Sequence, residues 1–283
     1  MSSKKRPGGN PARAGQAEDA REARRARAAA LRERELARER RRRVTLVTTA
    51  VVVALAVVAT VVVLVVRQRD AATSTEGATP AAATSASGGI VLEGSPAEGE
   101  APTVDVWLDY QCPFCAQLED TTGEALTELA AEGEARVVVH AVSFLDANLR
   151  NDSSERAAAA AAAAAEQDRF AEYTRVVFAD QPGHDGNPGA EGDGYTDEQL
   201  RAFAEEAGVP DLEAWQRAYD EGTYVGYVRR VEAARAEQGV QGTPTVRLTP
   251  ADGGEATDLD ASRLLDAQGP QYLREQVAAV AAP

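Results

Sequence analysis

The sequence of 283 residues predicts an α/β domain preceded by a single transmembrane helix and a disordered linker. Three observations support this prediction: an uncharged apolar segment over 44–66, a segment of low complexity after it, and a series of strand and helix patterns beyond residue 101. The series reads strand, helix, strand, several helices, two strands and helices. Such an order predicts a sheet that contains a parallel βαβ unit.

Charge is distributed unevenly along the chain, whose net charge is −15. Residues 1–43 hold 15 Lys and Arg against 6 Asp and Glu, residues 44–66 hold none, and residues 67–283 hold 15 against 39. A nucleic-acid-binding surface needs clustered basic residues, so the acidic body excludes nucleic acid as a partner. Two His, one Met and two Cys are too few to hold a haem, copper or iron–sulfur centre.

Residues 44–66 form the predicted transmembrane helix. As a helix they would extend about 34 Å, at ~1.5 Å per residue, against a hydrocarbon core of ~30 Å. A buried core helix and a cleaved signal peptide are the alternatives, but a signal peptide has a shorter apolar region of ~7–15 residues near the N-terminus. Four arginines over 40–43 adjoin the segment, so the positive-inside rule places the N-terminus in the cytoplasm and the acidic body outside. The sequence therefore predicts a single-pass protein of the cell membrane.

Two polar segments flank the predicted span. Residues 1–43 form a basic cytoplasmic arm, whose charge suits the anionic inner leaflet of the lipid bilayer. Residues 71–89 are mostly Ala, Thr, Ser and Gly, and residues 93–102 are rich in Gly, Pro and Glu. We therefore predict a flexible linker over 67–100 and a folded domain over 101–283.

The folded domain begins with a strand and a helix joined by the two cysteines. Thr103–Asp109 alternates apolar and polar residues, as a strand does. The motif CPFC over 112–115 follows, and Pro113 suits the first turn of a helix, where its missing N–H is not needed. Apolar residues at steps of three or four continue this helix to Gly133. A second strand over 136–144 holds three consecutive valines, which predicts burial on both faces.

The middle of the domain is predicted to be helical. Nine consecutive alanines over 157–165 predict a tightly packed helix, and the apolar pattern continues to Phe178. A Gly-rich loop follows over 181–194, and Thr196, with Gln three residues into the next helix, predicts a capping box. The remaining predicted elements are helices over 212–219 and 224–238, strands over 243–248 and 255–259, and helices over 262–267 and 270–280.

Cys112 and Cys115 are the only cysteines, and they lie on the predicted outer side, where disulfides persist. A zinc site, a structural disulfide and two unreactive buried thiols are the alternatives to a redox pair. Zinc needs about four N or S ligands, and a disulfide across so short a loop removes little unfolded-state entropy. A redox pair explains the spacing: the helix N-terminus favours a Cys112 thiolate, and Cys115, one turn on, can resolve a mixed disulfide. The helix dipole alone would lower the pKa of Cys112 only from ~8.5 to ~7.

Several motifs together carry a family resemblance. DYQCPFC over 109–115, with GTPT over 242–245 about 130 residues later, resembles the DsbA-like branch of the thioredoxin superfamily. The segments 154–156, 170–181 and 200–209 are similar to that family as well. The resemblance covers roughly 101–280 and implies a thioredoxin-like fold with a helical insertion at about 150–238.

The resemblance also implies the roles of individual residues. Cys112 and Cys115 would be the catalytic pair, and Pro244 would be cis and pack beside their disulfide. The backbone of Thr243 would bind an extended substrate by strand addition, and Pro113 and Phe114 would contribute to substrate binding. Without the resemblance, Pro244 would equally suit the entry of a strand.

Two departures from the family leave the redox potential open. Many thioredoxin-like proteins have a buried acid six residues before the first cysteine, where this chain has Val106. Asp109 is nearer the motif and is expected to act electrostatically or to cap a turn. The remaining candidates have structural interpretations: Trp107 as a core residue, His140 as packed or hydrogen-bonded in a strand, and His184 as solvated.

We therefore predict an extracytoplasmic thiol–disulfide oxidoreductase that donates disulfides to cysteine-containing secreted or surface proteins. Its redox centre is the Cys112–Cys115 pair, with no metal and no other cofactor. Since the chain has no further cysteines, a quinone-linked oxidase of the membrane is the implied partner for re-oxidation. A thiol–disulfide reductase or isomerase, a non-catalytic peptide-binding module on a membrane tether, and a scaffold that acts through its basic arm are the alternatives.

Overall fold

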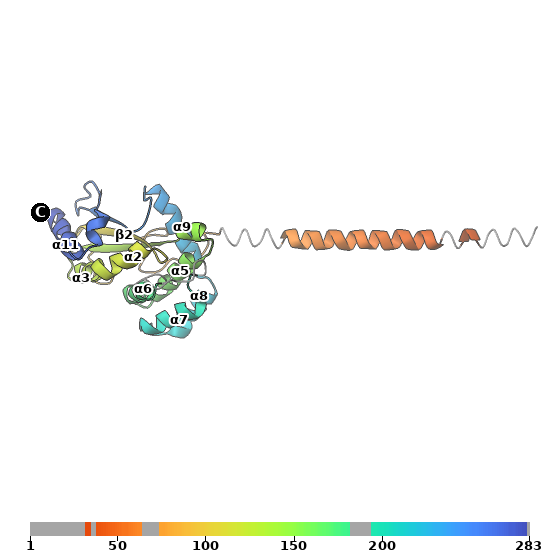
Figure 1. Cartoon of the computed structure of the whole chain (residues 1–283), viewed down its shortest axis with the longest axis horizontal. Coiled ribbons are helices and arrows are strands. Elements are labelled where there is room, and N and C mark those ends of the chain that lie inside the picture. Colours follow the sequence, from red (N-terminus) through yellow and green to blue (C-terminus); the bar gives the residue numbers. More distant parts are fainter. Residues whose placement is uncertain (1–31, 35–37, 64–73, 182–193, 282–283) are drawn as a thin grey trace, which may run out of the picture. The chain divides into compact units, whose positions relative to one another are not determined.

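The computed structural model describes residues 32–34, 38–63, 74–181 and 194–281. The chain divides into two compact units, 1–72 and 73–283, which are described separately (Figure 1). The predicted transmembrane helix lies in the first unit and the predicted redox motif in the second.

Residues 38–63 of the first unit are helical. Within the described residues, this is the one helix that is long and apolar enough to cross a membrane. The hydroxyl groups of Thr45, Thr48 and Thr60 donate to backbone carbonyls four residues earlier, so the helix satisfies its own polar side chains. The last three residues of the predicted span, most of the basic arm and residues 67–73 lie outside the described residues.

The second unit is built on a five-stranded sheet in the order β1-β3-β2-β4-β5. β2 (Thr103–Asp109) and β3 (Arg136–Val142) are parallel and central, with Val106 opposite Val139. Both strands are almost entirely buried, as their valine-rich sequences predict. The outer strands β1 (Ile90–Val91), β4 (Thr245–Thr249) and β5 (Thr257–Asp258) pair antiparallel.

The connection from β2 to β3 is one long helical segment. It consists of α2 (Pro113–Leu118), a π-helical turn η1 (Glu119–Gly123) and α3 (Glu124–Ala131), and it ends at Gly133, whose φ is +73°. The sequence predicts this helix and its end but not the π-helical turn. The chain closes with α10 (Ala261–Leu264) and α11 (Gly269–Val280), and α11 packs against α3 and β4.

The predicted helical insertion lies between β3 and β4. Its helices are α4 (Leu145–Leu149), α5 (Ser153–Ala165), α6 (Phe170–Ala179), α7 (Asp197–Glu206), α8 (Leu212–Asp220) and α9 (Val225–Glu237). Thr196 and Gln199 form the predicted capping box. α7 and α8 lie at the opposite end of the unit from α3 and α11 (Figure 1). The Gly-rich loop lies largely outside the described residues.

The alanine run is the centre of the insertion. All nine alanines over 157–165 are buried, and α5 contacts α6, α8, α9 and β3. Methyl side chains let these neighbours approach closely, and Trp215 on α8 donates its indole N–H to the Ala160 carbonyl at 3.0 Å. The low-complexity run is therefore a packed core helix, as predicted.

The predicted linker over 67–100 is wrong from residue 74 onward. Residues 74–100 belong to the second unit, and we call residues 74–92 the strap. In the strap, β1 adds an edge strand to β3, and Ile90 and Leu92 are buried. Backbone groups of the strap accept hydrogen bonds from α9, with Tyr227 donating to Gly88 and Arg230 to Ala86. The composition predicts a coil because β1 holds only two residues, too few for a recognisable periodicity.

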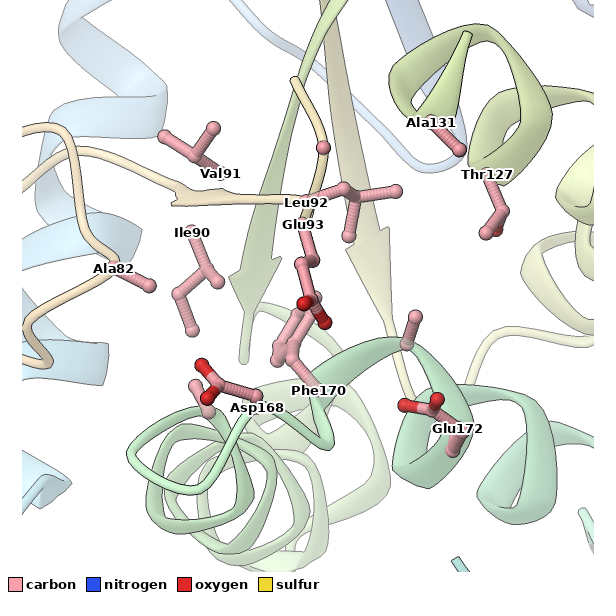
Figure 2. Close-up of a pocket in the computed structure, with 13 residues that line it drawn as sticks. Ala82, Ile90, Val91, Leu92, Glu93, Thr127, Ala131, Asp168, Phe170 and Glu172 are labelled. Carbon is pink, nitrogen blue, oxygen red and sulfur yellow. The ribbon is translucent and has the colours of Figure 1, made fainter.

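A cleft of about 460 Å³ lies between the strap, α3 and the start of α6 (Figure 2). Ile90, Leu92 and Phe170 line it, and Glu93 and Asp168 bring carboxylates to it. Neither cysteine lines this cleft. The cleft is therefore separate from the candidate site, which lies at the start of α2.

Candidate active site

The turn from β2 to α2 presents the first cysteine. Cys112 is the N-cap of α2 in extended conformation, and its carbonyl accepts the N–H groups of Cys115 and Ala116 at 3.0 and 3.2 Å. Pro113 occupies the first helical position, where its missing N–H leaves no helical bond unmade. The Cys112 N–H donates to the Asp109 carbonyl at 2.9 Å, which closes the turn.

The structure brings the predicted residues Cys112, Cys115, Thr243 and Pro244 together from distant parts of the chain. The Thr243–Pro244 peptide bond is cis, as the resemblance implies. The Cys112 thiol donates to the Thr243 carbonyl at 3.4 Å. Cys112 is 5% exposed and Cys115 is 1% exposed, and both are free thiols. Both thiols are buried, and Cys112 is the slightly more exposed of the two.

The two thiols have opposite tendencies to ionise. The pKa of Cys112 is lowered from 9.0 to about 6, foremost because the Cys115 thiol donates a hydrogen bond to it. The Thr243 side chain and the N–H groups of Phe114 and Cys115 add to this effect, and burial opposes it. Burial raises the pKa of Cys115 well above its ordinary value. Cys112 is therefore the nucleophile or leaving group of the pair at neutral pH.

This difference predicts the pH dependence of alkylation. With iodoacetamide, the rate at Cys112 is expected to titrate with a midpoint near pH 6 and to fall about tenfold per pH unit below it, because only the thiolate reacts. Mass spectrometry after timed quenching measures the rate, and a Cys112→Ser chain reports any labelling at Cys115. A midpoint above pH 8 would contradict the stabilised thiolate.

Asp109 caps the turn rather than facing solvent. Its carboxylate accepts the Gln111 N–H at 2.9 Å, the Leu145 N–H at 3.1 Å and the Ser154 hydroxyl at 2.5 Å. Complete burial raises the pKa of Asp109 to about 7, and these three donors oppose the rise. Asp109 thus joins the cysteine turn to α4 and α5, which favours the turn-capping interpretation.

The side chain of Gln111 extends this polar network. Its amide donates to Asp146, Asn151 and Ser154 over 2.7 to 2.9 Å and accepts from Asn151. The turn before Cys112 is therefore fixed by the helical insertion and not only by the sheet.

Two residues that the sequence does not indicate also hold this turn. Gln181 donates to the carbonyls of Tyr110 and Cys112 at 2.7 and 3.1 Å, and Tyr195 donates to the Tyr110 carbonyl at 2.7 Å. Both are buried, and they flank the predicted Gly-rich loop on its two sides. Gln181 ends the segment 170–181 that is similar to the family, whereas Tyr195 has no sequence signal beyond its place after the loop.

The two middle residues of the motif face outward. Pro113 is exposed, and Phe114 is 60% exposed, unusually high for a phenyl ring in this domain. Their predicted role in substrate binding stays a prediction, to which this exposure is suited.

Trp107 and His140 have the structural roles that the sequence predicts. Trp107 is buried and stacks on His140 with ring centroids 4.5 Å apart. His140 is 2.8 Å from an Asp105 carboxylate oxygen. His184 lies outside the described residues. No cluster of three or more His, Cys, Asp or Glu that could hold a metal ion occurs within the described part of the chain.

Comparison with solved structures finds proteins of similar fold. The chain is similar to the MdbA thiol–disulfide oxidoreductase of Actinomyces oris, with 22% identity, 74% of this chain and 92% of that chain covered, and a TM-score of 0.56. MdbA of Corynebacterium diphtheriae has 22% identity, 67% and 93% coverage, and a TM-score of 0.51. BdbD of Bacillus subtilis has 19% identity, 73% and 99% coverage, and a TM-score of 0.52. At these identities the likeness shows a shared fold.

Sequence comparison identifies the family, which the structural comparison does not. No curated protein matches the chain. The family model described as the DSBA-like thioredoxin domain matches residues 103–278, which include the sheet from β2 onward, the CPFC motif and the helical insertion. The chain therefore belongs to the DSBA-like thioredoxin domain family.

Proposed function

We propose that this thiol–disulfide oxidoreductase of the DsbA type donates disulfide bonds to cysteine-containing proteins outside the cytoplasmic membrane. The observation that carries the proposal is the contrast between the two sulfurs. Cys112, the slightly more exposed of the two, is stabilised as a thiolate, and Cys115 is a fully buried thiol that stays protonated. A substrate thiolate attacks Cys112 of the disulfide, and a second substrate thiolate then releases Cys112 as the stabilised leaving group.

Stabilising the thiolate makes the disulfide form a stronger oxidant. The folded pKa of Cys112 lies below its ordinary value, so the reduced protein gains stability that is fully present above about pH 9 and lost as the pH falls through about 6. At pH 7 the gain is about 1.4 kcal/mol, which corresponds to about 30 mV in the two-electron potential. This shift makes the reduction potential of the pair higher, which favours donation of disulfides over reduction of them.

The surroundings of Cys112 suit a protein substrate. Pro113 and Phe114 follow Cys112 directly and are exposed, and the Thr243 carbonyl lies 3.4 Å from the Cys112 sulfur. An extended segment that adds to the backbone at Thr243 would present its own cysteine to Cys112. The Cys112–Cys115 pair is the whole redox centre in this proposal, with no further cofactor.

The proposed location and partner follow from the first unit. The apolar helix would anchor the chain in the cell membrane, with the arginine cluster on the cytoplasmic side and the catalytic domain outside. Re-oxidation requires an electron acceptor outside this chain, and a quinone-linked oxidase of the same membrane is the proposed one. Secreted and surface proteins would be the substrates.

The reduction potential of the pair tests the direction of electron flow. For the domain over 74–283 in glutathione buffers, we expect a value that lies toward ~−120 mV, typical of a disulfide donor. A value toward ~−270 mV would instead support a reductase. Fluorescence of Trp107 and Trp215, or alkylation followed by mass spectrometry, measures the fraction reduced.

A further inference from the structure

The short helix α4 borders the redox pair on the side away from the cis peptide bond. β2 and β3 are parallel neighbours with Asp109 opposite Val142, so their carboxyl ends meet at the same edge of the sheet. The Cys112 turn follows β2 at this edge, and α4 follows β3. β4, which the cis peptide bond precedes, pairs with the other side of β2. In the order of the sheet, Cys112 therefore has α4 on one side and the cis peptide bond on the other.

Hydrogen bonds join the end of α4 to the residue before Cys112. The side-chain amides of Gln111 and Asn151 form a reciprocal pair, with N–O distances of 2.9 and 2.8 Å. Asn151 directly follows Arg150, the residue that ends α4. Arg150 is therefore held at the edge of the cysteine turn, where a polypeptide that extends past Cys112 on this side would meet it.

The outer surface of α4 is not covered by other elements of the domain. Residues 147–150 are all exposed, and the side chain of Leu149 is 43% exposed. Within the described part of the second unit, Leu149 and Phe114 are the two large apolar side chains that are exposed. Both lie on segments that border Cys112, so this surface is open to a molecule that binds at the redox pair.

The backbone of Arg150 has a conformation that favours glycine. Its φ is +59° and its ψ is +39°, and its N–H donates to the Asp146 carbonyl. Glycine or asparagine is usual where a helix ends in this left-handed conformation, because a larger side chain makes it costly. Residues in such conformations cluster at functional sites. An arginine at this position therefore points to a use of its side chain outside the fold.

The guanidinium group of Arg150 has no hydrogen-bond or ion-pair partner in the part of the chain that the structure describes. The two nearest carboxylates along the sequence are engaged elsewhere. Asp146 accepts three hydrogen bonds of 2.7 to 2.9 Å from other residues, and Asp152 pairs with Arg156 at 2.8 Å. Residues 67–283 hold 15 basic against 39 acidic residues, so acidic partners for an arginine are plentiful in this domain. The charge of Arg150 is nevertheless available to an acidic group of another molecule.

We propose that Arg150 binds a carboxylate of the substrate polypeptide and thereby selects segments in which Asp or Glu lies near the reactive cysteine. The proposal rests on the proposed function and adds the class of substrate to it. A segment that binds the backbone at Thr243 would present its cysteine to Cys112 and an acidic side chain to Arg150 on the far side of the sulfur. An exposed ion pair of this kind is expected to change a rate constant by about two- to fivefold.

Disulfide transfer to a set of short peptides tests this inference. Each reduced peptide has two cysteines and one test residue, Glu, Gln or Lys, placed at one of several positions before the first cysteine or after the second. The oxidised full-length chain in detergent is mixed with each peptide at pH 7, and transfer is followed by acid quenching and mass spectrometry. Each rate is divided by the rate of the same peptide with the neutral 2-hydroxyethyl disulfide, which removes the effect of the test residue on the peptide thiol.

The wild-type chain is expected to oxidise the Glu peptide about two- to fivefold faster than the Gln peptide at one or more adjoining positions, and the Lys peptide more slowly. Arg150→Gln should abolish this ratio at those positions. Arg150→Glu should reverse it, so that the Lys peptide reacts faster than the Glu peptide.

Two further variants separate substrate selection from a structural effect. Arg150→Gly should also abolish the ratio, while its urea midpoint should not fall below that of wild type, because glycine suits the left-handed backbone. Arg217→Gln, which removes an exposed arginine from α8, is the matched control and should keep the wild-type ratio.

The outcomes distinguish this inference from the proposed function. A wild-type chain with equal normalised rates for the Glu and Gln peptides at every position would overturn the role of Arg150 and leave disulfide donation intact. An Arg150→Gln chain that keeps the wild-type ratio would overturn it as well. A wild-type chain that oxidises none of the peptides would overturn the proposed function itself.

Discussion

A Cys112→Ser substitution is expected to reduce disulfide transfer to a reduced two-cysteine peptide to the rate of the uncatalysed reaction. Cys112 holds the sulfur that is stabilised as a thiolate and is the more exposed of the pair, and a serine hydroxyl at this position can form no mixed disulfide. Serine is smaller and polar, so the turn held by Asp109, Gln181 and Tyr195 should remain folded. Circular dichroism and the urea midpoint of the variant check that point.

Cys115→Ser should behave differently, and the contrast makes the experiment specific. This variant keeps the Cys112 thiolate but loses the thiol that stabilises it and resolves mixed disulfides. Its Cys112 thiolate attacks a peptide that already holds a disulfide and releases one of the two peptide sulfurs as a thiolate, so we expect the mixed disulfide on Cys112 to accumulate on non-reducing gels. We also expect a higher pKa at Cys112. If Cys112→Ser kept its transfer activity, a peptide-binding or scaffold role would replace the enzymatic one.

Removing the strap is expected to destabilise the domain severely. A fragment over 101–283 lacks β1, so it leaves the outer edge of β3 unpaired and removes the buried side chains of Ile90 and Leu92 from the core. Burial of two such side chains contributes about 3–6 kcal/mol, a large part of the ~5–15 kcal/mol that typically stabilises a domain. We expect the unfolding free energy in urea to be lower by at least about 3 kcal/mol than for the fragment over 74–283.

A point variant keeps this prediction testable if the shorter fragment does not fold at all. Ile90→Ala in the fragment over 74–283 should lower the unfolding free energy by about 2–5 kcal/mol. Glu93→Ala, which changes an exposed side chain at the edge of the cleft, is the matched control. Equal stability of the fragments over 74–283 and 101–283 would show that the strap is only a linker.

The sequence predicts best those helices and strands whose pattern of apolar and polar residues repeats over many positions. β2, the helix after CPFC, α7 with its capping box and the alanine helix α5 all repeat one pattern over seven or more residues. β1 has two residues and gains its structure from β3, and α4 is fixed by a hydrogen bond from its first N–H to Asp109. Tertiary contacts decide such short elements, so no local pattern reveals them.

The site divides in the same way. The spacing of Cys112 and Cys115 and the family motif around Pro244 predict the pair and the cis peptide bond beside it. Gln181 and Tyr195 are not predicted as site residues, since an isolated polar side chain beside a loop is usually solvated. Their role becomes visible only when the fold places both side chains on the backbone carbonyls of the turn before α2.

The strap also sets how far the catalytic domain can travel from its anchor. Only residues 64–73 separate the apolar helix from the strap, and ten residues at ~3.5 Å each reach at most about 35 Å. A free leash over 67–100 would reach about 120 Å by the same measure, and the volume it could explore would be about 40 times larger. With the proposed membrane anchor, Cys112 would therefore meet partners that come to the bilayer surface at a far higher effective concentration than proteins already released from it.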